Sequence, residues 1–227
     1  METRFPNESM EYRAARQALL EEEIALNERV KKVAELRRTL PTGGALKEDY
    51  VFTGANDGIL GDEMRFSELF GERKSLLLYS YMFGDSWDNP CPLCTSLIDG
   101  MDRASVSVVP HAGFAIVAKA SAGRLNEWAK SRGWTSITLL SAKDNTYMAD
   151  YLSQRGDDES TLMTMMNVFQ KDGDAIHHFW GSEMRGNHVD LIWPYWNLMD
   201  MTPQGRPDSS IPELGFTSQY LIDNYLS

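Results

Sequence analysis

The sequence has only two cysteines among its 227 residues, no strongly basic region and no long apolar run. Two cysteines cannot form the several bridges that hold small secreted domains together, so the fold has to depend on an apolar core. Hydrophobic residues make up 42% of the chain, which suffices for one domain with additions. No segment approaches the roughly 20 apolar residues of a membrane helix, and the opening residues lack the hydrophobic core of a signal peptide. We therefore expect a cytoplasmic protein with no membrane partner.

Positive charge is also scarce, since 22 Lys and Arg stand against 33 Asp and Glu, for a formal net charge of -11. An acidic surface repels phosphate groups, so nucleic acid is not expected as a partner. The charge is unevenly distributed, because the residues up to Leu40 include eight basic and eight acidic side chains. This difference predicts an N-terminal segment whose character differs from that of the rest of the chain.

Proline and glycine are absent from Glu8 to Leu40. Apolar side chains recur there at spacings of three, four or seven, which predicts one long amphipathic helix, capped by Ser9 and stopped near Pro41. Its apolar stripe fits packing on the main domain or on a partner, because Glu22 and Glu23 interrupt a coiled-coil seam. A homodimer through this helix is therefore one expected arrangement.

The remainder alternates predicted strands and helices. Strands are expected at 50–52, 75–83, 113–118 and 137–140, followed by a hairpin of 164–170 and 175–180; helices are expected at 66–70, with Ser67 as its cap, at 91–105 and at 122–132. This order predicts an α/β fold with a central mixed sheet flanked by helices, in which strand 75–83 is central. We expect a helical extension at 1–44, one domain at 45–200 and a C-terminal tail at 201–227.

Cys91 and Cys94 form the motif Cys-Pro-Leu-Cys between the apolar strand and a helix that can begin at Pro92. A thiol at a helix start lies over unpaired backbone N–H groups and the positive end of the helix dipole, which both favour the thiolate. The thiol one turn further in is more shielded and keeps its proton. We predict that Cys91 is the nucleophile and Cys94 the resolving thiol of a redox site that needs no cofactor.

Two other interpretations of the cysteine pair remain. The pair can be half of a zinc site, but zinc usually takes four ligands. No matching second pair is provided by the histidines, which are His111, His177, His178 and His188; no metal is therefore expected. Free cysteines can also be ordinary buried core residues.

The chain contains the segments FSELFGERKSLLLYSYMFGDSWDNPCPLC, AIVAKASAGRLNEWAKSRGW, NVFQKDGDAIHHFW and LMDMTPQGRPD. Together they resemble a bacterial family of thioredoxin-like proteins that carries only an unknown-function label. In that family a long N-terminal helix precedes a thioredoxin-like domain with a Cys-x-x-Cys pair at the reactive position. The resemblance implies a three-layer thioredoxin-like fold and implies no substrate.

The site departs from the better-known members of this fold. In thioredoxins a tryptophan directly precedes the first cysteine and a cis-proline faces the pair, whereas here Pro90 precedes Cys91. Thr164, Met165 and Met166 occupy the place that corresponds to the cis-proline. These differences put the docking of an extended peptide beside the cysteines in doubt.

Peroxiredoxins carry a threonine three residues before their reactive cysteine, and here that residue is Asp88. Trp87 and Asp88 are expected to shape the entrance to the cysteines. The leading hypothesis is a thiol–disulfide oxidoreductase that acts on a protein or small-molecule thiol or disulfide. The alternatives are a non-catalytic interaction or ligand-binding protein on the same scaffold, and a thiol peroxidase in which Cys91 forms a sulfenic acid that Cys94 captures.

Overall fold

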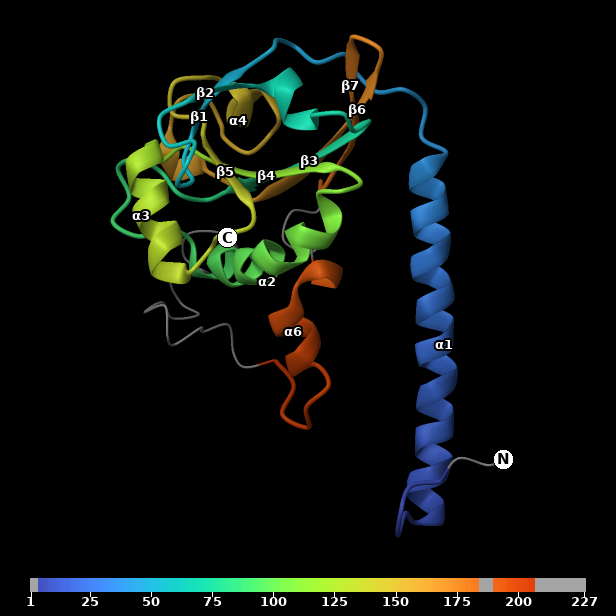
Figure 1. Cartoon of the computed structure of the whole chain (residues 1–227). Coiled ribbons are helices and arrows are strands. Elements are labelled where there is room, and N and C mark those ends of the chain that lie inside the picture. Colours follow the sequence, from blue (N-terminus) through green and yellow to red (C-terminus); the bar gives the residue numbers. More distant parts are fainter. Residues whose placement is uncertain (1–3, 184–189, 207–227) are drawn as a thin grey trace. The chain divides into compact units, whose positions relative to one another are not determined.

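A computed structural model describes residues 4–183 and 190–206 (Figure 1). The chain divides into two units, Met1–Thr42 and Gly43–Ser227. The first unit contains α1, which runs from Met10 to Arg38 and is capped by Ser9, whose Oγ accepts the N–H of Tyr12 at 3.0 Å. The predicted long helix and its cap are confirmed. None of its side chains is buried, and the homodimer expected through it stays a prediction.

The second unit is built on one seven-stranded mixed sheet with the strand order β2-β1-β5-β4-β3-β6-β7. The strands are β1 (Val51–Gly54), β2 (Glu63–Arg65), β3 (Ser75–Tyr81), β4 (Gly113–Ala118), β5 (Thr138–Ser141), β6 (Met165–Asp172) and β7 (Ala175–Gly181). Strands β3, β4 and β5 are parallel, and all other neighbours are antiparallel. Parallel neighbours need a crossover connection, and helices α2 and α3 provide the two crossovers here. Strand β3, which the sequence predicted to be central, is an inner strand next to the middle strand β4.

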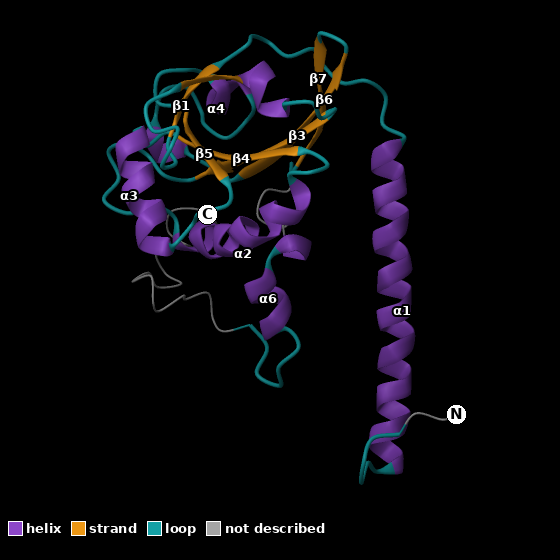
Figure 2. Cartoon of the chain, viewed as in Figure 1, coloured by secondary structure: helices purple, strands orange, loops and turns teal. Residues whose placement is uncertain are grey.

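Helices cover both faces of this sheet (Figure 2). One face is covered by α2 (Pro92–Val108) and α3 (Ala122–Arg132), and the other by the 3₁₀ helix η1 (Phe66–Phe70) and the short α4 (Tyr147–Asp150). Two further 3₁₀ turns, η2 (Glu159–Thr161) and η3 (Asp190–Ile192), lie in connections. The three-layer, thioredoxin-like α/β arrangement predicted from the sequence is confirmed.

Strand β3 separates two apolar cores through its alternating side chains. Tyr79 and Tyr81 point toward α2 and join the core that contains the cysteines, whereas Leu76 and Leu78 join the core on the opposite face. All four side chains are at most 1% exposed. The apolar run therefore forms a strand buried on both faces, and every second residue of it faces the helix that carries Cys94.

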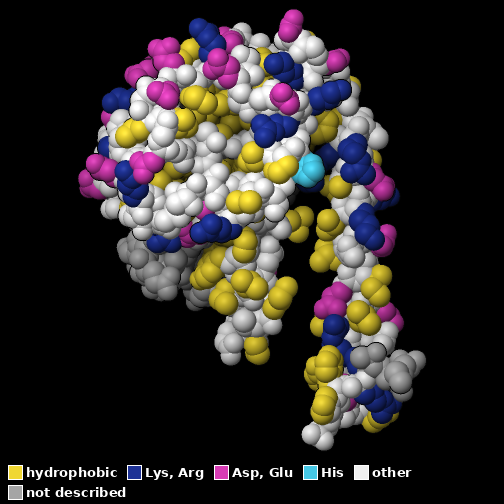
Figure 3. All heavy atoms as spheres, in the orientation of Figure 1, with side chains coloured by type: hydrophobic (Ala, Val, Ile, Leu, Met, Phe, Trp, Pro, Cys, Tyr) yellow, Lys and Arg dark blue, Asp and Glu magenta, His cyan; other side chains and the backbone are white. Residues whose placement is uncertain are grey.

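Helix α6 (Pro194–Met199) packs against α2 from the outside. Trp193 and Trp196 point inward, and Nε1 of Trp193 donates to Oγ of Ser96 on α2 at 2.9 Å. Figure 3 shows hydrophobic side chains gathered over this helix, and Leu198 and Met201 are among the exposed ones. Trp193 and Trp196 are thus part of the apolar core that contains α2.

Three sequence predictions differ from the structure in detail. Strand β2 was not expected; it pairs with β1 through only three residues. Ser67 is not the cap of η1, because Arg65 occupies that position and Ser67 instead donates its N–H and hydroxyl to Asp49 at 2.8 and 2.9 Å. Helix α2 continues through Gly100 to Val108. The expected boundaries at 44 and 200 stay predictions, and most of the expected tail, from 207 on, lies outside the described residues.

Candidate dithiol site

The two cysteines lie where the loop after β3 enters α2. Cys91 is the N-cap of α2, and its Sγ accepts the backbone N–H of Cys94 at 3.4 Å. Its own N–H donates to the carbonyl of Met82 at 2.9 Å, and Thr95 donates both its N–H and its hydroxyl to the carbonyl of Cys91, at 3.0 and 2.9 Å. Pro92 begins the helix, where its missing N–H has no intrahelical partner to lose. The predicted position of the pair is therefore the one observed.

Both thiols are buried, with Cys91 5% and Cys94 4% exposed. They belong to one apolar core with side chains from the end of β3, from β6 and from α6. The sequence had led us to expect a first thiol more accessible than the second. A reaction partner therefore has to reach both sulfurs through the surrounding apolar side chains.

The pKa values of the two thiols are shifted in opposite directions. The pKa of Cys91 is raised well above its usual value, first because its S–H donates to Cys94 and then because of burial. Burial also raises the pKa of Cys94, but hydrogen bonds from Cys91, from the hydroxyls of Tyr79 and Thr164 and from the N–H of Met82 outweigh it, and the pKa is lowered. Of the two thiols, Cys94 is therefore the one that ionises first, and the S–H of Cys91 donates to it.

This order of pKa values is the reverse of the one predicted from the helix start. The Sγ of Cys91 receives backbone N–H groups of Leu93 and Cys94, as the helix position leads one to expect. Cys94 receives side-chain hydroxyl donors in addition. Hydrogen bonds to a charged sulfur favour its ionised form. The side-chain donors therefore explain why the pKa is lowered at Cys94 and raised at Cys91.

Tyr79 is the site residue that the sequence reasoning missed. Its phenol oxygen accepts the hydroxyl proton of Thr164 at 2.6 Å, and it forms a hydrogen bond with Cys94. The pKa of Tyr79 is raised well above its usual value, chiefly by burial and by the charge of Cys94. Its place at an alternate position of the apolar strand before the motif is a signal that could have identified it.

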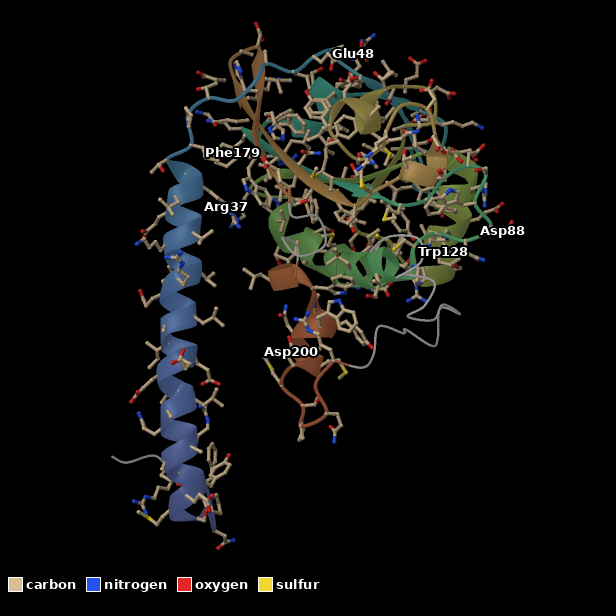
Figure 4. The ribbon with its side chains drawn as sticks, turned by 180° about the vertical axis from the view of Figure 1, so that it is seen from behind. Arg37, Glu48, Asp88, Trp128, Phe179 and Asp200 are labelled. Atoms are coloured by element: carbon tan, nitrogen blue, oxygen red, sulfur yellow. The ribbon has the colours of Figure 1, made fainter. Side chains whose placement is uncertain are left out.

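The residues expected to shape the site fall into two groups. Thr164 lies beside the dithiol through its contact with Tyr79, and Met165 is 4% exposed, with its sulfur accepting the hydroxyl of Ser182 at 3.4 Å. Pro90 is buried directly before the pair. Trp87 is half-buried, whereas Asp88 is exposed at the outer surface of the domain (Figure 4). A role of these residues in the reaction stays a prediction.

The loop in front of the cysteines is fixed from two sides. The guanidinium of Arg124 on α3 donates to the carbonyls of Asp85 and Trp87 and lies over the ring of Phe83, with its Cζ 5.1 Å from the centroid. The carboxylate of Glu159 accepts the N–H groups of Asp85 and Ser86 at 2.9 and 3.0 Å. The chain therefore approaches Cys91 along a fixed path.

The histidines that the sequence offered do not gather around the cysteines. His177 contacts the carbonyl of Gly43, and His178 lies 2.9 Å from Oδ1 of Asn167; His188 lies outside the described residues. Within 4–183 and 190–206, no group of three or more His, Cys, Asp or Glu side chains could hold a metal ion. In the same part of the chain, no helix has the length and apolar character needed to cross a membrane.

Comparison with known proteins identifies the family. No curated protein matches the sequence. Among solved structures, similar chains are the exposed lipoprotein thioredoxin (Etrx1) of Streptococcus pneumoniae (16% identity, 58% of this chain and 87% of that one, TM-score 0.41), the peroxidoxin BcpB of Mycobacterium tuberculosis (17%, 68% and 94%, 0.46) and thioredoxin peroxidase I of Plasmodium yoelii (18%, 70% and 91%, 0.47). Residues 1–224 match one family over nearly the whole sequence. The chain belongs to this family, which is described as bacterial protein of unknown function (DUF899).

Proposed function

We propose that the protein is a thiol–disulfide oxidoreductase in which Cys91 and Cys94 alternate between a dithiol and a disulfide. The observation that carries this proposal is the pair itself: two free thiols lie at the start of α2, the Sγ of Cys91 accepts the N–H of Cys94 at 3.4 Å, and the pKa of Cys94 is lowered. A thiolate is the reactive form in exchange with a disulfide, and a second thiol nearby resolves the mixed disulfide.

A dithiol with one ionised sulfur reduces a substrate disulfide in two steps. Cys91 passes its proton to the Cys94 thiolate and attacks one sulfur of a substrate disulfide, so that a mixed disulfide forms and the first substrate thiolate leaves. This leaving thiolate takes the proton from Cys94. Cys94 then attacks the Sγ of Cys91, the mixed disulfide breaks, and the second substrate thiolate leaves. The substrate disulfide is reduced by two electrons, and the protein dithiol is oxidised to a disulfide.

The burial of both sulfurs bears on the substrate. Cys91 and Cys94 are 5% and 4% exposed, and Thr164 stands at the place where related dithiol proteins carry the proline that faces an extended peptide. Both features favour a small-molecule disulfide over a disulfide in a folded protein. The reducing cytoplasm, where structural disulfides are rare, is the compartment that suits such a dithiol.

Trapping the mixed disulfide tests the proposal. With oxidised glutathione as the probe, Cys94→Ser is expected to gain one glutathione at Cys91, because the variant lacks the resolving thiol. The matched variant Cys91→Ser is expected to gain much less, and the native protein should form the internal disulfide instead. Intact-mass and peptide-mass measurements identify each product. Absence of an adduct in Cys94→Ser, together with absence of a disulfide in the native protein, would overturn the proposal.

A further inference from the structure

Strand β3 holds Tyr79 in a fixed position in the core that contains Cys91 and Cys94. Tyr79 pairs with Ile116 of β4 on one side and with Met166 of β6 on the other. The side chain is 1% exposed and lies in the core that contains both cysteines. A tyrosine paired with a strand on both sides has little freedom to move, so its hydroxyl is held at one place relative to Cys94.

The hydroxyl of Tyr79 has two partners with different roles. Thr164 donates its proton to the phenol oxygen at 2.6 Å, and the phenol's hydrogen bond with Cys94 lowers the pKa of that thiol. A phenol carries a single proton. Because the phenol oxygen of Tyr79 accepts the proton of Thr164, the phenol's own proton is free to point toward the sulfur of Cys94. Thr164 therefore orients the hydroxyl of Tyr79 toward Cys94.

A neighbouring tyrosine lacks this arrangement. Tyr81 projects from the same face of β3 and is equally buried, but its hydroxyl lies 2.5 Å from Oγ1 of Thr95. The two tyrosines thus differ in the partner of the hydroxyl far more than in their surroundings. Of the two tyrosines, Tyr79 is the one whose hydroxyl forms a hydrogen bond with a cysteine sulfur, that of Cys94.

We propose that Tyr79 is a catalytic residue of the dithiol, whose hydroxyl donates a hydrogen bond to the sulfur of Cys94 and stabilises the negative charge there. This inference rests on the proposed oxidoreductase function. When an incoming thiolate attacks the Sγ of Cys91 in the oxidised protein, the bond between the two cysteine sulfurs breaks and its electron pair moves to Cys94. In this step Cys91 becomes part of a mixed disulfide and has no proton to donate, so the hydroxyls of Tyr79 and Thr164 and the N–H of Met82 are the groups that stabilise the charge on Cys94. Tyr79 stabilises this buried charge without giving up its proton.

The variant Tyr79→Phe tests the inference, with Tyr81→Phe as the matched control. Loss of one hydrogen bond to a charged group corresponds to about a 10- to 100-fold decrease in the acid dissociation constant of Cys94. The thiol–disulfide equilibrium should move toward the disulfide by the same factor above the pKa of Cys94, and each tenfold corresponds to about 30 mV. At a pH where both thiols are protonated the difference should disappear. NMR of isotope-labelled cysteine Cβ atoms against pH, and equilibration with glutathione, measure the two effects.

Each outcome decides one point. A shift in Tyr79→Phe that Tyr81→Phe does not share supports the inference, and a shift in the same direction is expected for Thr164→Val, which removes a hydroxyl that contacts both Tyr79 and Cys94. If the native protein cycles normally and Tyr79→Phe titrates like it, or if Tyr81→Phe shifts equally, the inference on Tyr79 is wrong. If the native protein forms no disulfide at all, the oxidoreductase function fails, and the Cys94 titration still shows whether Tyr79 donates to the sulfur.

Discussion

Replacing Gly100 with alanine is expected to push α6 away from the helix that carries the cysteines. A Cβ at Gly100 would lie 2.8 Å from Cγ and 2.9 Å from Cδ of Pro194, the first residue of α6. Carbon atoms in contact are normally about 3.5–4.0 Å apart, so the proline ring has to move. The preceding residue, Trp193, is hydrogen-bonded to Ser96 on α2, and this bond should be strained or lost.

Two opposing effects set the size of the change. Alanine in place of glycine inside a helix stabilises by about 0.5–1 kcal/mol, whereas forcing extra atoms into a packed site costs about 1–3 kcal/mol. Gly123 in α3 is the matched control, because a Cβ there meets nothing within 4 Å. We expect Gly123→Ala to raise the free energy of unfolding by up to about 1 kcal/mol, and Gly100→Ala to be about 1–3 kcal/mol less stable than that control.

Denaturant unfolding measures the stability of both variants, and tryptophan emission reports on α6. Trp193 and Trp196 are 6% and 8% exposed, so displacement of α6 should move the emission to longer wavelength. Alkylation of the two cysteines should also become faster, since the apolar core around them includes both tryptophans. If Gly100→Ala is as stable as Gly123→Ala and its tryptophan emission is unchanged, Pro194 of α6 does not pack against Gly100 of α2 as described.

Two further predictions concern the loop that leads to Cys91. The ammonium of Lys143 is the main cause that lowers the pKa of Asp85 from 3.8 to about 2. A carboxyl group whose pKa is lowered in the folded protein stabilises the fold at pH values above its unfolded pKa, and this stabilisation is lost as the pH falls through the lowered pKa. Asp85→Asn should therefore lose less unfolding free energy than the native protein between about pH 5 and about pH 2. Equal losses in denaturant unfolding would show that the ion pair is not formed. Glu159→Gln weakens two hydrogen bonds to backbone N–H groups, and it should lower the free energy of unfolding by about 1–3 kcal/mol and speed hydrogen exchange at Ser86. The exposed ion pair of Glu28 supplies the control, since Glu28→Gln should change stability by less than about 1 kcal/mol.

Most of the fold follows from local features of the sequence. The apolar spacing and the absence of proline and glycine predicted α1 almost to its ends, and Ser9 caps it as expected. The continuous apolar run at β3 predicted a strand buried on both faces, and Pro92 marked the first residue of α2. In each case the residues that predict the element lie within the element itself, so the prediction does not depend on which other segments pack against it.

The features that were missed depend on contacts between distant segments. The hydroxyl of Tyr79 meets Thr164, which lies 85 residues later in the chain, and this pairing places side-chain donors at Cys94. The helix start alone predicts the lower thiol pKa for Cys91, whereas the side-chain donors lower the pKa of Cys94. Glycine destabilises a helix interior, yet Gly100 lies inside α2, where the close packing of Pro194 leaves no room for a larger side chain.

The reduction potential of the Cys91–Cys94 pair tests the central claim most directly. The full-length protein is equilibrated in glutathione buffers of graded potential, its free thiols are alkylated, and the masses give the fraction oxidised. A redox-active dithiol of this fold predicts one two-electron transition between about -270 and -120 mV, the range of thioredoxin-like dithiols, with the disulfide joining Cys91 to Cys94. Persistence of both free thiols at potentials up to about -120 mV would contradict the claim.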